Sequence, residues 1–166
     1  MKLHPCFLLL ASVSVAICAH ADGAGEFTRK GKTVKFTHAT AFRFEDHPNV
    51  STRIIFSTQP IDTAKAVAAP GGLVPQNAIA QVKQSGYVTL DVTDGGELET
   101  IGYYGPDGIM GNATDNPTFT RHDARHVTGT FRTADESEKT GDGTGYYDLT
   151  FDIDVVAPAA GGGFSY

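Results

Sequence analysis

Cysteine is nearly absent from this chain, and its two copies, Cys6 and Cys18, both lie within the first 21 residues. Because residues 22–166 contain no cysteine, a domain held together by disulfides is excluded. A stretch of that length can still fold unaided, since a domain of about 150 residues buries roughly two thirds of its unfolded surface. We therefore expect one domain over residues 22–158, followed by a flexible tail over 159–166.

Basic residues are also scarce. Residues 22–166 keep all 19 acidic residues and 12 of the 13 basic ones, a balance of −7. Nucleic-acid binding requires a basic surface, and so does attraction to anionic membranes. Neither a nucleic acid nor a membrane is therefore expected as a partner of the mature chain.

A long uncharged apolar run occurs at the amino terminus, over residues 6–18 (CFLLLASVSVAIC). Lys2 precedes it, and Ala19-His20-Ala21 supplies the small-x-small pattern of a cleavage site. The run is too short for a membrane span, which needs about 20 residues. Residues 1–21 are therefore predicted to be a signal peptide, and the protein is expected to be secreted or periplasmic. A lipoprotein anchored through Cys18 is the alternative, but it would call for a small residue where Ile17 stands.

Period-two alternation of apolar and polar residues predicts strands. It is clearest over 146–155, where the inward set should be Tyr147, Leu149, Phe151, Ile153 and Val155. A second alternating stretch, Thr33–Glu45, predicts one long strand or two strands with a bend near 37–40. There the phenylalanines are expected to face inward, and Lys35 and Arg43 outward.

Turn signals place the other elements. A strand is predicted over 51–58, a hairpin over 87–104 around Asp94-Gly95-Gly96, and a second hairpin or a bent strand pair over 119–132. Short helices are expected over 62–69 and 78–84, capped by Asp62 and Asn77. Segments 22–31, 105–117 and 134–145 are expected to be non-regular.

The fold class predicted is all-β, mainly antiparallel: a two-sheet sandwich of about seven strands with one or two short helices. A closed β-barrel is the alternative.

Three short segments carry a family resemblance: Arg53–Asp62, Val127–Phe131 and Tyr147–Asp152. The chain resembles a set of uncharacterised exported bacterial β-rich proteins. The shared features are a strand ending in Pro-x-Asp, a Gly-x-Phe strand and a final Tyr-Asp-x-x-Phe strand. The resemblance implies export and a β architecture. It implies no activity and transfers no functional residue.

Two histidines, His122 and His126, lie four residues apart in RHDARH (121–126). They could offer two nitrogens to a metal ion, with His38 or His47 as a third ligand. Arg121 and Arg125 beside them disfavour a cation, so no metal ligand is predicted. Whether the two histidines join a metal site is left open.

Three carboxylates share the outer side of the last strand: Asp148, Asp152 and Asp154. A straight strand spaces such groups too widely for calcium. A solvated outer face is therefore favoured over a cation site. If the first and last strands are neighbours, Lys35 and Arg43 should pair with these carboxylates.

No catalytic, cofactor-binding or metal-binding residue is predicted, and no cofactor. No serine lies in a nucleophile-elbow context, and the glycine-rich segments do not match a phosphate loop. Asn49 and Asn112 begin glycosylation sequons, which matter only in a eukaryote.

The function expected is that of a non-enzymatic binding module for a protein or small molecule. An extracytoplasmic metal-dependent or hydrolytic enzyme and an inhibitor or immunity-type protein are the alternatives.

Overall fold

The computed structural model describes residues 22–46, 49–69, 74–106, 108–111 and 113–157. The expected signal peptide (1–21) and tail (159–166), the two sequon asparagine side chains and His47 lie outside what it describes, so those interpretations stay predictions. Among the described residues, no helix is long and apolar enough to cross a membrane.

The described chain forms ten strands, two short α-helices and one 3₁₀ helix. The strands are β1 (Asp22–Arg29), β2 (Lys32–Phe36), β3 (His38–Asp46), β4 (Asn49–Ser57), β5 (Tyr87–Thr93), β6 (Leu98–Gly105), β7 (Gly108–Gly111), β8 (Thr118–His122), β9 (His126–Arg132) and β10 (Tyr146–Val156). The helices are α1 (Thr63–Ala68), α2 (Val74–Val82) and η1 (Glu136–Lys139).

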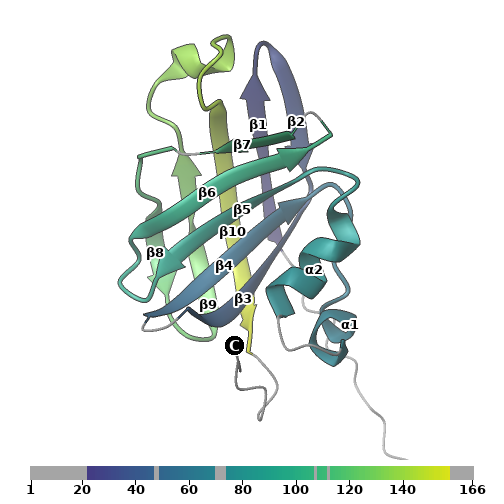
Figure 1. Cartoon of the computed structure of the whole chain (residues 1–166). Helices are drawn as coiled ribbons and strands as arrows, with labels where there is room; N and C mark the ends of the chain where they lie inside the picture. Colours follow the sequence, from purple (N-terminus) through teal and green to yellow (C-terminus); the bar gives the residue numbers. More distant parts are fainter. Residues whose placement is uncertain (1–21, 47–48, 70–73, 107, 112, 158–166) are drawn as a thin grey trace, which may run out of the picture.

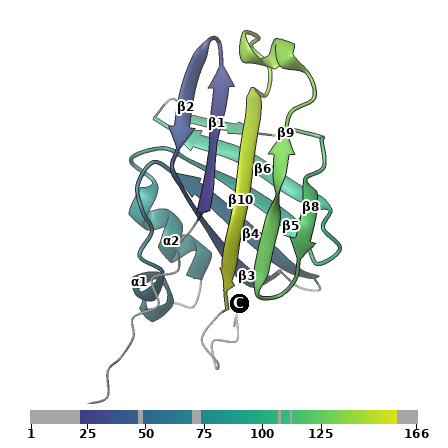
Figure 2. The same cartoon turned by 180° about the vertical axis from the view of Figure 1, so that it is seen from behind.

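The strands form two layers that cross each other at an angle (Figures 1 and 2). One layer has the order β2-β1-β10-β9-β8, and the other β3-β4-β5-β6-β7. The end of β10 joins them, because Val155 and Val156 pair in parallel with Ala41 and Phe42 of β3. The all-β prediction is confirmed. Through this junction the two layers form one large curled sheet, and the sheet is mixed, because the pairing of β10 with β3 is parallel. Among the described pairings, β2, β7 and β8 each have one neighbour, so these strands do not close a barrel.

A single core fills the space between the layers. The alternation predicted for β10 is confirmed, because Tyr147, Leu149, Phe151, Ile153 and Val155 are all buried in this core. The opposite layer contributes Ile54, Phe56, Leu90 and Ile101 to the same core. The last strand therefore anchors both layers through one face.

A second, smaller core lies on the far side of β3, β4 and β5, under the helices. Phe42 and Ile55 face α2 residues there, whereas Ala39 and Ala41 face the space between the layers. The expected orientation of β3 is therefore wrong: the phenylalanine parity points toward the helices, and the Arg43 parity points between the layers. The predicted break in Thr33–Glu45 is confirmed, because β2 ends at Phe36 and β3 begins at His38.

Four local expectations need correction. Segment 134–145 is not wholly non-regular, because it contains the 3₁₀ helix η1. Segment 22–31 is not a loose lead-in, because β1 pairs with β10 on one side and with β2 on the other. Segment 105–117 contains the short strand β7, which pairs with β6. Asn77 lies inside α2 and does not cap it; its side-chain amide donates to the Ala66 carbonyl of α1 at 3.2 Å. The Asp62 cap is confirmed, since its carboxylate accepts from the Lys65 amide at 2.9 Å.

Candidate functional site

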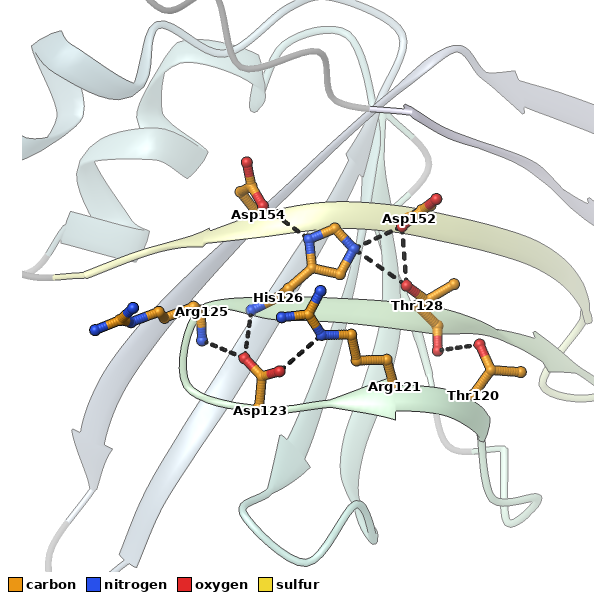
Figure 3. A network of polar contacts seen from close by, with 8 residues as sticks. All are labelled: Thr120, Arg121, Asp123, Arg125, His126, Thr128, Asp152 and Asp154. Carbon is orange, nitrogen blue, oxygen red and sulfur yellow. Dashed lines mark hydrogen bonds and ion pairs between the residues drawn. The ribbon is translucent and has the colours of Figure 1, made fainter.

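The β8–β9 hairpin turn is organised by one carboxylate, Asp123 (Figure 3). Asp123 Oδ1 accepts from the backbone amides of Arg125 and His126, at 2.8 and 3.0 Å, and Oδ2 accepts from Arg121 Nε at 2.7 Å. An aspartate that bonds its own following backbone in this way forms a tight turn. The Arg121 hydrogen bond, followed by the amide bonds, lowers the pKa of Asp123 to about 2. The turn is therefore held by a fixed negative charge.

A cavity of about 190 Å³ opens beside this turn, at one end of the space between the layers. Its lining comes from three separate places in the chain: Arg43 of β3, Asp94 of the β5–β6 turn, and His122, Asp123 and Ala124 of the β8–β9 hairpin. Charged and polar side chains thus dominate the opening.

An ion pair forms one wall of the cavity. Arg43 Nη2 donates to Asp94 Oδ2 at 2.7 Å, and the two side chains are 26% and 52% exposed. Arg43 lies opposite Thr52 in the β3–β4 register, on the parity that faces the other layer. This orientation brings its guanidinium to the end of the core instead of to the outer surface.

His122 forms a second wall. Its ring lies 4.6 Å from the ring of Phe119, and burial lowers its pKa, although Asp94 acts in the opposite direction. The imidazole is therefore neutral at pH 7. The Nε2 atom of His122 is buried and has no hydrogen-bond partner. The same is true of the Oγ1 atom of Thr52, the residue opposite Arg43 in the β3–β4 pairing. Buried polar atoms normally have a partner, so these two atoms are exceptions within the core.

The lining consists of two carboxylates, a guanidinium, an imidazole and the methyl group of an alanine. The Arg43 guanidinium would repel a metal ion from Asp94 and His122. Within the described ranges, no three His, Cys, Asp or Glu side chains are arranged to hold a metal ion. The groups present suit ion pairing and hydrogen bonding with a small polar ligand.

On the outer face of the same hairpin, His126 bridges two carboxylates of β10 (Figure 3). Its Nδ1 lies 2.7 Å from Asp154 Oδ1, and its Nε2 lies 2.6 Å from Asp152 Oδ1. The hydrogen bonds with Asp154 and Asp152 raise the pKa of His126. Both ring nitrogens can donate to these carboxylates only when the imidazole is protonated. His126 therefore acts as a charged link between β9 and β10.

This network resembles a catalytic triad in outline, because Thr128 Oγ1 lies 3.1 Å from His126 Nε2. Its chemistry is different. Thr128 donates its proton to Asp152 at 2.9 Å, and Asp152 also occupies the His126 nitrogen that would have to accept it. The network therefore links β9 to β10 through His126, Thr128 and the two carboxylates.

The charge of His126 makes the stability of the protein depend on pH. A raised pKa means that its contribution is complete below the ordinary value of 6.5 and is lost as the pH rises through the folded value. Asp152 has a lowered pKa, chiefly through His126, so its contribution is lost as the pH falls below 3.8. His126→Gln should therefore lower the free energy of unfolding by about 0.5–1 kcal/mol near pH 5.5, and by less near pH 8.5.

Urea unfolding at the two pH values measures this difference. Thr130→Ala, on the same strand and exposed, is the matched control. Equal losses for His126→Gln at both pH values would show that His126 contributes by packing and not by charge.

The acidic residues of β10 find partners on β9. Asp148 accepts from Arg132 at 2.6 Å, while Asp152 and Asp154 bind His126. The hypothesis that Lys35 and Arg43 pair with them is wrong. Lys35 is on β2, which β1 separates from β10, and Arg43 of β3 pairs with Asp94. These carboxylates therefore contribute cross-strand pairs on an outer face.

The two histidines singled out in RHDARH end on opposite faces of the hairpin: His122 lines the cavity and His126 binds the β10 carboxylates. His38 is at the other end of β3 from Arg43. Sequence reasoning missed Arg43 and Asp94 as site residues. In the structure, Arg43 shares its side of β3 with Ala39 and Ala41, which are fully buried.

No family model, curated protein or solved structure matches this chain. The resemblance to exported bacterial β-rich proteins gains no support from these comparisons, and the functional argument depends on the geometry alone.

Proposed function

We propose that this protein is a non-enzymatic binding module, and that its ligand is a small polar molecule held in the cavity at the β8–β9 end of the two layers. The observation that carries the proposal is the lining itself. A half-exposed ion pair, Arg43–Asp94, and the His122 imidazole meet at one opening.

The cavity volume favours a small ligand over a protein segment. Pockets for drug-sized ligands begin at roughly 300 Å³, and this cavity has about 190 Å³. The surrounding strands would hold the lining in place, because Arg43 and His122 both lie on strands that are paired with neighbours. A pre-formed site loses little conformational entropy on binding.

Filling the cavity should abolish binding. Ala124 is exposed at the opening, so Ala124→Phe should place a ring in the ligand's position without disturbing the core. We expect a broad set of small carboxylates, amines, amino acids and sugars to contain at least one compound that shifts the backbone amide resonances of Arg43, Asp94 and His122. Ala124→Phe should weaken that compound's binding more than about tenfold.

Ala134→Phe is the matched control, since Ala134 is also exposed and lies beyond the opposite end of β9. It should leave binding unchanged. If no compound in the set shifts the cavity resonances, or if both phenylalanine variants bind equally well, the proposed function is wrong.

Export is the second part of the proposal, and it is supported by the sequence of residues 1–21 alone. We propose that the mature protein begins at Asp22 and acts outside the cytoplasm. Intact-mass measurement on protein recovered from the extracytoplasmic fraction should give the mass of residues 22–166. A lipidated chain beginning at Cys18 would overturn this cleavage site.

A further inference from the structure

The cavity's charges specify the class of its ligand. We propose that it binds a small zwitterion, such as a free α-amino acid, with the ligand carboxylate on Arg43 and the ligand ammonium on Asp94. This inference rests on the proposed binding function and adds the ligand's chemistry.

Both members of the Arg43–Asp94 pair have unused bonding capacity. Only Nη2 of Arg43 and Oδ2 of Asp94 take part in the hydrogen bond between them. Throughout the described residues, the remaining guanidinium nitrogens of Arg43 and the Oδ1 atom of Asp94 have no side-chain or backbone partner. A guanidinium presents five N–H donors and suits a carboxylate, and a carboxylate oxygen suits an ammonium group.

Asp123 suits this role less well than Asp94. Its two oxygens already accept three hydrogen bonds, from Arg121 and from the backbone amides of Arg125 and His126. Asp94 accepts one side-chain hydrogen bond, from Arg43, and therefore has more capacity for a ligand's proton donors.

Charge balance favours a ligand with both signs. The free N–H groups of Arg43 and the free Oδ1 atom of Asp94 lie on the two members of one ion pair, so that pair can stay intact when a ligand binds. A zwitterion can place its carboxylate on the Arg43 N–H groups and its ammonium on Asp94 Oδ1 at the same time, whereas a ligand with a single charge uses only one of the two groups. His122 is neutral and does not disturb this balance.

The test compares ligands that differ by one charged group. Each proteinogenic L-amino acid is titrated into the full exported protein, and backbone amide shifts of the cavity residues are followed. For the tightest amino acid, the matched acid without the amino group and the matched amine without the carboxylate are titrated next. We expect each single-charge analogue to bind more than about tenfold more weakly.

Variants locate the two contacts. Arg43→Gln and Asp94→Asn should each reduce amino-acid binding by a similar factor, and Arg132→Gln should not, because Arg132 pairs with Asp148 on the outer face. Urea unfolding of each variant checks that it is folded. The analogue comparison uses the unaltered protein and does not depend on the variants.

The outcomes separate this inference from the proposed function. Equal binding of a single-charge analogue would overturn the zwitterion and leave the cavity as a binding site. Binding of a sugar or another polar compound, without binding of any amino acid, would do the same. If no compound of any class shifts the cavity resonances, both the inference and the proposed function fail.

Discussion

Phe151→Ala is expected to lower the free energy of unfolding by about 3–5 kcal/mol, the usual cost of truncating a buried phenylalanine. Phe151 is fully buried in the middle of β10. Its ring makes edge-on contacts with Phe56 of the opposite layer and Phe119 of β8, with centroids 6.2 and 5.6 Å apart. One residue thus links β10, the second layer and the hairpin that carries the cavity.

The neighbourhood of Phe151 cannot easily fill the space that alanine would leave. Gly129 lies opposite Phe151 in the β9–β10 register, and a Cβ on it would come within 2.5 Å of the Thr118 carbonyl oxygen. The backbone beside the ring is therefore already in close contact with β8. A cavity that cannot collapse costs more than the lost transfer energy alone.

Thr150→Ala is the control for Phe151→Ala, because Thr150 is the preceding residue and is exposed on the outer face. It should change the free energy of unfolding by less than about 0.5 kcal/mol. The measurement is urea unfolding followed by circular dichroism. A loss for Thr150→Ala as large as that for Phe151→Ala would contradict this assignment of the two faces of β10.

The elements that sequence reasoning predicted well are those whose signal is local. β10 alternates from Tyr147 to Val155 because one face is buried in the core and the other is more exposed. The β5–β6 hairpin is specified by Asp94-Gly95-Gly96, where Gly96 adopts a positive φ of 81°. The Asp62 cap of α1 is also a local feature. Each depends on residues within a few positions of one another.

β1 was missed because its inward positions have almost no side chain. A Cβ on Gly23 would lie 2.2 Å from the Cβ of Ala39, so glycine is required where β1 crosses β3. A strand whose buried positions are glycine shows no apolar alternation. Only the final residues of its inward face, such as Phe27, are large and buried.

The orientation of β3 was predicted wrongly for a different reason. Both of its faces are buried, one against the other layer and one against the helices, so alternation cannot tell which face is which. For a related reason, the cavity could not be predicted from the sequence. Arg43, Asp94 and His122 come together only through the pairing of distant strands, and no spacing within the sequence indicates that arrangement.

The ion pair between Arg53 and Asp91 gives the second large effect. Arg53 of β4 donates two hydrogen bonds to Asp91 of β5, at 2.7 and 2.6 Å, and the Asp91 side chain is 4% exposed. Arg53 Cζ also lies 5.0 Å from the centre of the Phe44 ring. Burial lowers the pKa of Arg53, but the hydrogen bonds and charge of Asp91 outweigh burial and raise it.

Asp91→Ala should lower the free energy of unfolding by about 2–4 kcal/mol, because it leaves a mostly buried guanidinium without its counter-charge. The expected loss is somewhat below that of a fully buried pair, since the Arg53 side chain is 19% exposed and can regain some water. The double variant Arg53→Met/Asp91→Leu should recover most of the loss, because two apolar side chains of similar size need no partner. Urea unfolding of the single and double variants gives the coupling between the two positions. If the double variant is as unstable as Asp91→Ala, then the cost lies in the lost cross-strand hydrogen bonds, and the unpaired charge of Arg53 is not its cause.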